Sequence, residues 1–463
     1  MKIVLATSPH VKHGSVLQAD FAPSARHMYS FAPVGLLSLA AAIERSGADD
    51  EVTLVDINRR IGASQVPLDA GFHAALAQHI AEYAPDLVGF MTECDSYHHV
   101  LQICAALKQV VPHCYIVLGG PHASVVAKET LARCPAIDSI VIGEGEATFV
   151  DWLDAIRNGR DTVVDGVVAR GKEGGIIEGG TRALIADLDS LPIPAYHLYT
   201  PDAGEEIFVE AGRGCPFQCG FCSTAPYWQR RHRVKSGSRL VEELQLLAQL
   251  FGTKRVHFTH DLFTANRKWV VSVCDNLIAA DLKIAWTCSA RTDTVDRELL
   301  ALIAKAGCNA IYFRIESGSE RILTSIGKEI SADLSTAAVE ACKDVGIAPN
   351  IGLIIGFPAE DRDSFSATMR AYEHYLRLGC RPAHIFGYCP FAGSSMFEGA
   401  QNYRFSGHFV DIPLGQAVDE AHRRMIGSNP ELFSSYFRPK LPQIEQYLLH
   451  AIDAVDEFSP LVE

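Results

Sequence analysis

The sequence predicts an α/β protein with an N-terminal doubly wound (Rossmann- or flavodoxin-like) domain, a partial (β/α)6 barrel and a small C-terminal helical cap. Three observations predict it. Short β-branched runs alternate with helical patterns from residue 1 to about 145, a segment with several glycines and prolines follows, and a second alternating run begins at Ile207. Alternation of strands with helices indicates parallel sheets. With 463 residues the chain is also too long for one hydrophobic core.

The first domain is expected over residues 1–156. Its predicted strands are 2–7, 52–57, 87–92, 115–119 and 139–142, and its predicted helices are 34–46, 69–83, 97–110 and 123–133. Ligands of doubly wound sheets bind at the carboxyl ends of the strands. The candidate binding loops are therefore 8–20, 93–99, 119–122 and 143–146.

A linker is expected over 157–206, as a β-ribbon and an extended segment, because glycines and prolines interrupt the pattern there. The barrel is expected over 207–391, with strands at 207–211, 255–259, 284–289, 310–315, 351–355 and 384–388. The site of such a barrel lies at the carboxyl ends of its strands. The cap is expected over 392–463, with helical patterns at 431–437 and 443–458.

Composition narrows the class of protein. Lys and Arg number 41 against 55 Asp and Glu, for a formal net charge of −14, and an acidic surface repels a phosphate backbone. Apolar runs fall short of the ~20 residues needed to span a bilayer. The N-terminal residues suit a first strand better than a signal peptide. We therefore expect a cytoplasmic protein that acts on neither nucleic acid nor membrane.

The chemical motif lies directly after the first barrel strand. Cys215, Cys219 and Cys222 place three of the 13 cysteines within eight residues. Thiolates suit iron–sulfur clusters and zinc. Zinc would want a fourth protein ligand, and no matching cysteine pair follows. A 4Fe–4S cluster held by three thiolates instead leaves one iron open to a chelating small molecule, with zinc or structural thiols as the alternatives.

This C-x3-C-x2-C motif, with Phe221 before its last cysteine, resembles the radical S-adenosylmethionine (SAM) superfamily. The resemblance implies that SAM chelates the open iron and is cleaved to a deoxyadenosyl radical, with no catalytic residue beyond the cluster and cofactors. Further segments resemble the family's SAM-binding positions at strand ends. The implied SAM contacts are Phe221, Asp261, Ser289, Arg291, Glu316, Ser317, Gly352 and Gly356.

Four of these SAM contacts have a structural alternative. Asp261 is expected near the SAM ammonium, but it could cap a helix. Arg291 could bind the SAM carboxylate or pair with a structural acid. Gly352 and Gly356 are expected against adenine, although any crowded strand end favours glycine.

The N-terminal domain adds a resemblance to the cobalamin-binding radical SAM subfamily, over roughly residues 1–390. Leu118–Ser124 and Ile142–Glu146 carry it. Paired glycines would leave space for the nucleotide tail of cobalamin, and the helix that follows could direct amides at its phosphate. The implied cobalamin contacts are Ser8, His10, Glu93, Gly119, Gly120, Pro121, His122, Gly143, Glu144 and Gly145.

One departure concerns the cobalt ligand. The D-x-H-x-x-G motif is absent, and neither His10 nor His13 has its spacing. The resemblance then implies a lower cobalt face without histidine, and the alternative is a domain that keeps the fold but has lost cobalamin. A basic run over 230–235 is preceded by Tyr227 and Trp228. It either contacts SAM, a cofactor or an anionic substrate, or is a solvent-exposed segment that leads into the next helix.

The leading function is a cobalamin-dependent radical SAM methyltransferase that moves a methyl group from methylcobalamin to an unactivated carbon of a small-molecule or natural-product precursor. The alternatives are a radical SAM cyclase or rearrangement enzyme, a tRNA-modifying enzyme and a non-catalytic iron–sulfur redox protein. The expected partners are a small-molecule or peptide substrate and an electron donor of the flavodoxin or ferredoxin type.

Overall fold

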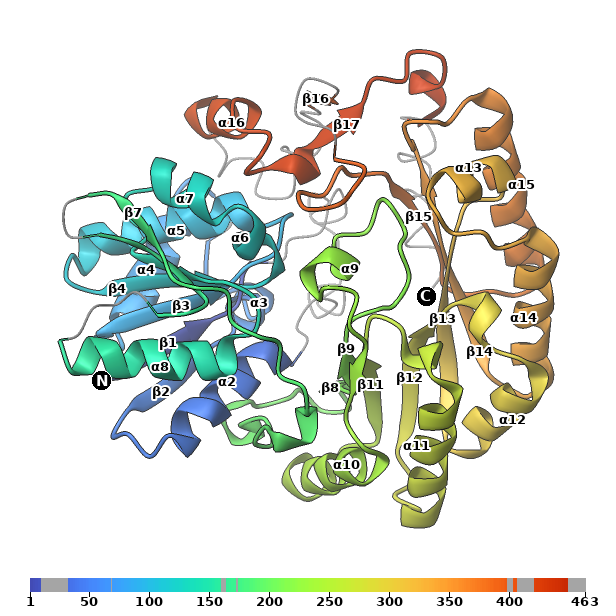
Figure 1. Ribbon diagram of the computed structural model, residues 1–463, viewed down its shortest axis with the longest axis horizontal. Helices are drawn as coiled ribbons and strands as arrows, with labels where there is room; N and C mark the ends of the chain where they lie inside the picture. The colour runs from blue at the N-terminus through green and yellow to red at the C-terminus, as the bar shows by residue number, and fades with distance from the viewer. Residues whose placement is uncertain are drawn as a thin grey trace.

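The computed structural model describes residues 1–9, 32–67, 69–159, 164–171, 174–397, 403–405 and 420–448. In Figure 1 a helix-covered sheet formed by the first half of the chain lies beside a curved sheet formed by the second half, and the segment of α16, β16 and β17 lies across one end of both. Within the described residues, no helix is long and apolar enough to cross a membrane.

The described N-terminal residues form a seven-stranded sheet in the order β2-β1-β3-β4-β5-β6-β7. The first five strands are parallel and confirm the prediction: β1 (Lys2–Ala6), β2 (Glu51–Val55), β3 (Leu87–Met91), β4 (Tyr115–Gly119) and β5 (Ser139–Val141). The order reverses at β1, where such folds bind their ligands. The helices are α2 (Val34–Arg45), α3 (Ile57–Gly62), α4 (Phe72–Ala81), α5 (Tyr97–Val110), α6 (Pro121–Val125), α7 (Ala127–Arg133) and α8 (Gly145–Arg157).

Two features of this half differ from the expectation. Gly145 and Glu146, expected in a loop, begin helix α8, which the sequence pattern did not indicate. The β-ribbon expected in the linker, β6 (Val167–Arg170) and β7 (Ile176–Glu178), pairs antiparallel to β5 and so extends the first sheet. Short 3-10 turns at Leu188–Ser190 and Tyr196–Leu198 then lead to the second half.

The second sheet is an open barrel with six described parallel strands in the order β15-β14-β13-β12-β11-β8. Its strands are β8 (Ile207–Glu210), β11 (Arg255–Thr259), β12 (Ala285–Ala290), β13 (Cys308–Glu316), β14 (Ala348–Ile355) and β15 (Ala383–Gly387). The helices that alternate with them are α10 (Gly237–Phe251), α11 (Arg267–Ala280), α12 (Arg297–Lys305), α13 (Glu320–Ser325), α14 (Ala332–Asp344) and α15 (Arg362–Arg377). The partial barrel is confirmed.

Alternation along the central strand β13 separates the two faces of this sheet. Ile311, Phe313 and Ile315 are buried in the core beneath the helices. Tyr312 and Arg314 lie between them and face the inside of the barrel, because successive strand residues point to opposite faces.

The C-terminal segment packs on the first domain. Its described elements are β16 (Tyr403–Phe405), α16 (Glu420–Gly427), a 3-10 turn at Ser434–Tyr436 and β17 (Phe437–Pro439). The helix expected over 431–437 is therefore wrong. The serines of this segment are weak helix formers, and Ser435 and Tyr436 instead donate hydrogen bonds to the carbonyls of Cys94 and Asp95. Of the pattern at 443–458, residues 445–448 are helical and those beyond 448 lie outside the described residues.

Buried histidines hold this contact together. Nδ1 of His98 lies 2.9 Å from Nε2 of His422 on α16, and Nε2 of His122 lies 2.8 Å from the carbonyl oxygen of Leu432. Next to them, Nε2 of His73 lies 2.9 Å from Nδ1 of His99. Burial lowers the pKa of His98 and His99 well below 6.5 and that of His122 to about 4.

We expect acid to loosen this packing. A histidine whose folded pKa lies below its unfolded pKa contributes its full stability above about pH 6.5 and loses it as the pH falls toward the folded value. For His122 alone, a shift from 6.5 to about 4 corresponds to roughly 3 kcal/mol by pH 4. The protection of residues 420–448 against hydrogen exchange, relative to the intrinsic rate at each pH, should therefore fall between pH 7 and pH 5.

The His122→Gln variant should flatten this pH dependence, while His197→Gln, which removes an exposed histidine paired with Glu44, should leave it unchanged. Protection of 420–448 that is constant from pH 7 to pH 5 in the unaltered protein would contradict the expectation.

Candidate functional site

The three motif cysteines lie in the loop between β9 (Gly212–Arg213) and α9 (Thr224–Tyr227), above the end of β8. Gly214 starts the loop at φ +89°, and a Cβ there would lie 1.9 Å from the carbonyl oxygen of Arg231. Its N–H donates a 2.7 Å hydrogen bond to Oδ2 of Asp261, at the end of β11. Farther along, the N–H of Gly220 bonds the carbonyl oxygen of Ile326. The loop is therefore anchored to the end of β11 on one side and to the end of α13 on the other.

The thiols suit a cluster better than a single ion. Among the described residues, no three His, Cys, Asp or Glu side chains are close enough to share one metal ion. Zinc needs ligands converging at about 2.3 Å from sulfur, whereas each thiolate of a cubane binds a different iron. Cys215, Cys219 and Cys222 are partly exposed. Burial, and then its neighbours Cys222 and Asp261, raise the pKa of Cys215 to about 11, so metal loading must displace a proton there.

Arg291 is committed to the protein. It forks onto both carboxylate oxygens of Asp293 at 2.9 and 2.7 Å, and its guanidinium lies 3.8 Å above the ring centre of Phe217. Its Nη1 is 3.7 Å from Sγ of Cys219. The guanidinium of Arg291, which was expected to bind the SAM carboxylate, is therefore paired with Asp293. It also places positive charge beside the thiol of Cys219.

The other expected SAM contacts divide into two groups. Asp261, Ser289 and Glu316 lie at strand ends around the cysteine loop, although one oxygen of Asp261 is taken by Gly214 and Glu316 pairs with Lys328 at 2.9 Å. Ser317 instead hydrogen-bonds Thr368 of α15.

The two glycines and Phe221 differ in what surrounds them. A Cβ on Gly352 would lie 1.9 Å from the hydroxyl of Tyr312, so this glycine makes room for a side chain of the barrel interior. Gly356, at φ +89°, donates its N–H to Glu360. The ring of Phe221 lies 5.6 Å from that of Phe357, which places the cysteine loop against the end of β14.

Sequence reasoning missed Arg314. It is exposed on the inner face of β13, and its side chain makes no hydrogen bond or ion pair with any described residue. The carboxylates of Glu316 and Asp261 and the thiol of Cys222 lie within electrostatic range of it. Period-two alternation along 310–316 places it on the same face as Glu316, and that pattern could have identified it.

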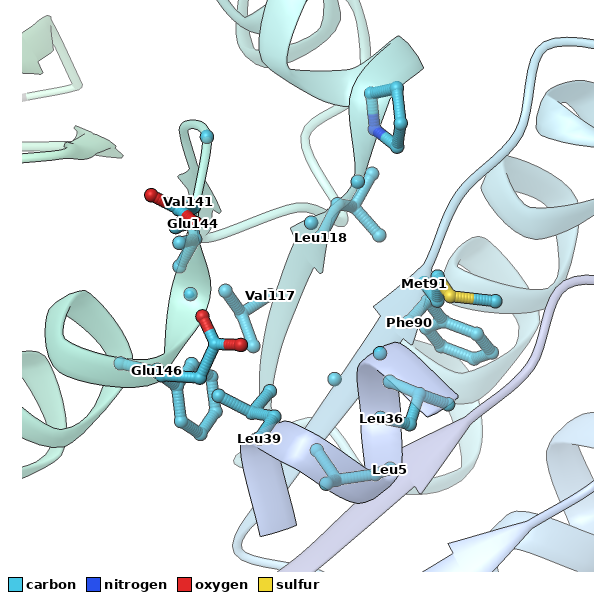
Figure 2. A pocket seen from close by; sticks show the side chains of 18 of the residues that line it. Leu5, Leu36, Leu39, Phe90, Met91, Val117, Leu118, Val141, Glu144 and Glu146 are labelled. Carbon is cyan, nitrogen blue, oxygen red and sulfur yellow. The ribbon is translucent and has the colours of Figure 1, made fainter. Parts of the chain in front are cut away.

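A second site is the cavity of about 230 Å³ at the carboxyl end of the first sheet (Figure 2). Leu36 and Leu39 of α2 and Val117 and Leu118 of β4 surround it, and glycines 35, 89, 119, 120, 143 and 145 also line it. A Cβ on Gly119 or Gly143 would meet nothing within 4 Å. An apolar, glycine-lined slot of this size suits a flat heteroaromatic base, such as the one that ends the nucleotide tail of cobalamin, and is too small for the corrin.

Most of the expected cobalamin contacts line this cavity: Gly119, Gly120, Pro121, Gly143, Glu144 and Gly145. His122 does not, because its ring turns to Leu432 and Tyr97. Ser8, whose carbonyl accepts from Asn58, and the exposed Glu93 lie outside the lining, and His10 lies outside the described residues. Among the described residues, no histidine lines the cavity. Leu36, Leu39 and Phe149 were missed because they look like ordinary core residues in the sequence.

The two sites share a wall. Tyr227 and Trp228, which follow the cysteine loop, line the cavity, and the hydroxyl of Tyr227 donates a 3.0 Å hydrogen bond to the carbonyl of Gly143. Of the basic run, Arg233 bonds Glu144 and lies 5.3 Å from the ring centre of Trp228. The run is therefore partly a contact between the two halves of the chain.

A doubly wound domain with a base-sized cavity, joined to an open barrel with three thiols at its first strand, defines a radical SAM enzyme with a cobalamin-binding domain. The sequence profile of the radical SAM superfamily matches residues 209–372, and that of the B12 binding domain matches residues 27–153. An uncharacterized methyltransferase of Pyrococcus horikoshii is 32% identical over 373 residues, which cover 79% of this chain and 78% of the relative. The chain therefore belongs to the cobalamin-binding radical SAM family.

Two further similarities are more distant. The anaerobic magnesium-protoporphyrin IX monomethyl ester cyclase of Rubrivivax gelatinosus is 25% identical over 351 residues, covering 73% of this chain and 61% of the cyclase. The radical SAM methyltransferase TsrM of Kitasatospora setae, solved with cobalamin and a 4Fe–4S cluster, shares the fold with a TM-score of 0.68 at 16% identity, covering 87% of this chain and 77% of TsrM. The protein is thus an enzyme whose cofactors are a 4Fe–4S cluster, SAM and cobalamin.

Proposed function

We propose that this enzyme transfers a methyl group to an unactivated carbon of a small molecule, with Cys215, Cys219 and Cys222 as the cluster ligands. The observation that carries the proposal is the shared wall: Arg213, Tyr227 and Trp228, which flank the cysteine loop, also line the cavity. When bound, SAM at the cluster supplies the radical that abstracts hydrogen and cobalamin supplies the methyl group. A reaction that uses both needs them at one substrate.

The protein's own residues would orient these groups. Asp261 and Gly214 hold the cysteine loop to the barrel, and Arg291 places positive charge beside Cys219. The glycines of the cavity let the backbone approach a flat base. The proposal also includes an external electron donor of the flavodoxin or ferredoxin type and a cytoplasmic location. It places the three domains at residues 1–156, 207–391 and 392–463.

A small-molecule substrate is favoured by two observations. TsrM has been solved with its tryptophan substrate and a SAM analogue bound, and the net charge of −14 disfavours tRNA. Radical cyclisation without net methyl transfer is the second candidate, because a cyclase is among the relatives.

Product mass tests the proposal. The reconstituted enzyme is incubated under reducing, oxygen-free conditions with methyl-labelled SAM and either a small-molecule extract or purified tRNA. The expected result is a labelled small molecule that is heavier than a consumed compound by one labelled methylene unit, since the methyl group replaces a hydrogen. Deoxyadenosine formed with an unlabelled product of altered structure would favour the cyclase, and labelled tRNA would overturn the proposed substrate class.

Arg314 takes the role that Arg291 was expected to fill. Its side chain faces the inside of the barrel within electrostatic range of Glu316 and Cys222, and makes no hydrogen bond or ion pair with a described residue, so it is placed to bind the SAM carboxylate. A charged hydrogen bond contributes roughly 1.5–3 kcal/mol, so Arg314→Met should weaken SAM binding by about 10- to 100-fold. Calorimetry on the cluster-loaded protein measures this.

Arg362→Met is the matched control, since Arg362 is also exposed but begins helix α15, with its guanidinium near the ring of Tyr447. If Arg314→Met bound SAM as tightly as the unaltered protein, a residue other than Arg314 would have to bind the SAM carboxylate.

A further inference from the structure

Arg213 forms a buried ionic contact between the two halves of the chain. Its Nη1 and Nη2 lie 2.6 Å from Oε1 of Glu144 and of Glu146, respectively, and its Nε lies 2.8 Å from Oε1 of Glu210. The side chains of Arg213, Glu144 and Glu146 are 5%, 5% and 8% exposed. A planar guanidinium can serve three carboxylates at once, which an ammonium cannot do with the same geometry.

Each end of this contact belongs to a cofactor site. Glu144 and Glu146 lie at the start of α8 and line the cavity of the first domain. Arg213 ends β9, two residues before Cys215. Only Gly214 lies between this guanidinium-bearing residue and the first proposed cluster ligand.

The surroundings fix the contact in place. Oε1 of Glu146 accepts a 2.8 Å hydrogen bond from Ser38 of α2, and Glu144 also binds Arg233 and the N–H of Ile185. Burial by itself would raise the pKa of Glu146, but the guanidinium of Arg213 lowers it below its ordinary value. The carboxylate is therefore charged at neutral pH, and removal of its partner would leave a buried charge unpaired.

We propose that Arg213 is a positioning residue, which holds the cysteine loop against the cobalamin cavity through Glu144 and Glu146 and so sets the separation of the two cofactors. The inference rests on the proposed function, since a reaction at one substrate is what requires a fixed separation. A mobile loop would still bind a cluster, but the separation of the cluster from the cavity of the first domain would no longer be fixed.

The test measures the separation itself. In the holoenzyme reduced to Co(II) cobalamin and a paramagnetic cluster, the magnetic coupling between the two centres is recorded by electron paramagnetic resonance. Arg213→Lys and Glu146→Gln should keep the iron content of the unaltered protein, and their coupling should weaken or broaden. Hydroxocobalamin should also bind them about tenfold more weakly, because Glu144 and Glu146 line the cavity and Arg213 holds them in place.

The barrel offers a matched control. Lys235 and Glu243 form an equally buried ion pair at 2.7 Å, 2% and 0% exposed, that lies within the second half of the chain. Glu243→Gln should lower the melting temperature as Glu146→Gln does, yet keep the magnetic coupling and the cobalamin affinity.

The two variants of the contact should also agree with each other. If either folds poorly, the other carries the test. The positioning role would be overturned if the magnetic coupling in Arg213→Lys and Glu146→Gln equalled that of the unaltered protein. It would also be overturned if the coupling changed as much in Glu243→Gln as in these two variants. Because the measurement needs no turnover, it is independent of whether the product is methylated.

Discussion

Alanine in place of Cys215, Cys219 or Cys222 is expected to abolish cluster absorbance and to reduce deoxyadenosine formation to background. Two thiolates cannot hold a cubane against solvent and leave a single iron open. Each replacement is measured by iron and sulfide content after anaerobic reconstitution, and by deoxyadenosine released after reduction in the presence of SAM.

Cys274→Ala is the matched control. This thiol is fully buried in α11, in the core beneath the barrel helices, so its loss should cost some stability and leave iron content unchanged. Full iron content in any of the three motif variants would show that another residue is a ligand.

Phenylalanine in place of Gly119 is expected to weaken cobalamin binding strongly while leaving the cluster intact. Gly119 lines the cavity and a Cβ there meets nothing within 4 Å, so the ring can occupy the slot without straining the backbone. The variant should bind hydroxocobalamin about 10- to 100-fold more weakly, since overfilling a packed site costs roughly 1–3 kcal/mol. It should still cleave SAM, and it should form no methylated product.

Gly175→Phe provides the comparison. Gly175 precedes β7 and likewise has open space at its Cβ position, but it lies far from the lining residues in sequence and is not among them. Its cobalamin affinity should match that of the unaltered protein. If Gly119→Phe bound cobalamin as tightly as the unaltered protein, the nucleotide tail would have to bind outside this cavity.

The arrangement of strands could be predicted because each has a local cause. β-Branched runs such as Val52–Leu54 in β2 and Ile351–Ile355 in β14 alternate with helical periods, and parallel order follows from that alternation. Helix α8 was not predicted because it starts at Gly145, and glycine has a low helix propensity. The 3-10 turn at Ser434–Tyr436 was not predicted because its side chains hydrogen-bond residues that lie more than 300 positions earlier in the chain.

The site shows a similar division. The cysteine spacing is visible in the sequence because one loop carries all three ligands. Contacts between segments that are distant in the sequence are not visible, since the sequence does not say that Gly352 would make room for Tyr312 or that His122 would turn to Leu432. The Arg213 contact was hidden for the same reason, because its partners lie 67 and 69 residues earlier in the chain.

The most direct test of the central claim is the electron paramagnetic resonance spectrum of the reduced, cobalamin-free enzyme before and after SAM is added. Three thiolates and one open iron predict a 4Fe–4S signal whose g-values shift when SAM binds. A protein that holds zinc, or whose cluster signal is indifferent to saturating SAM because a fourth side chain fills the open corner, would contradict the account.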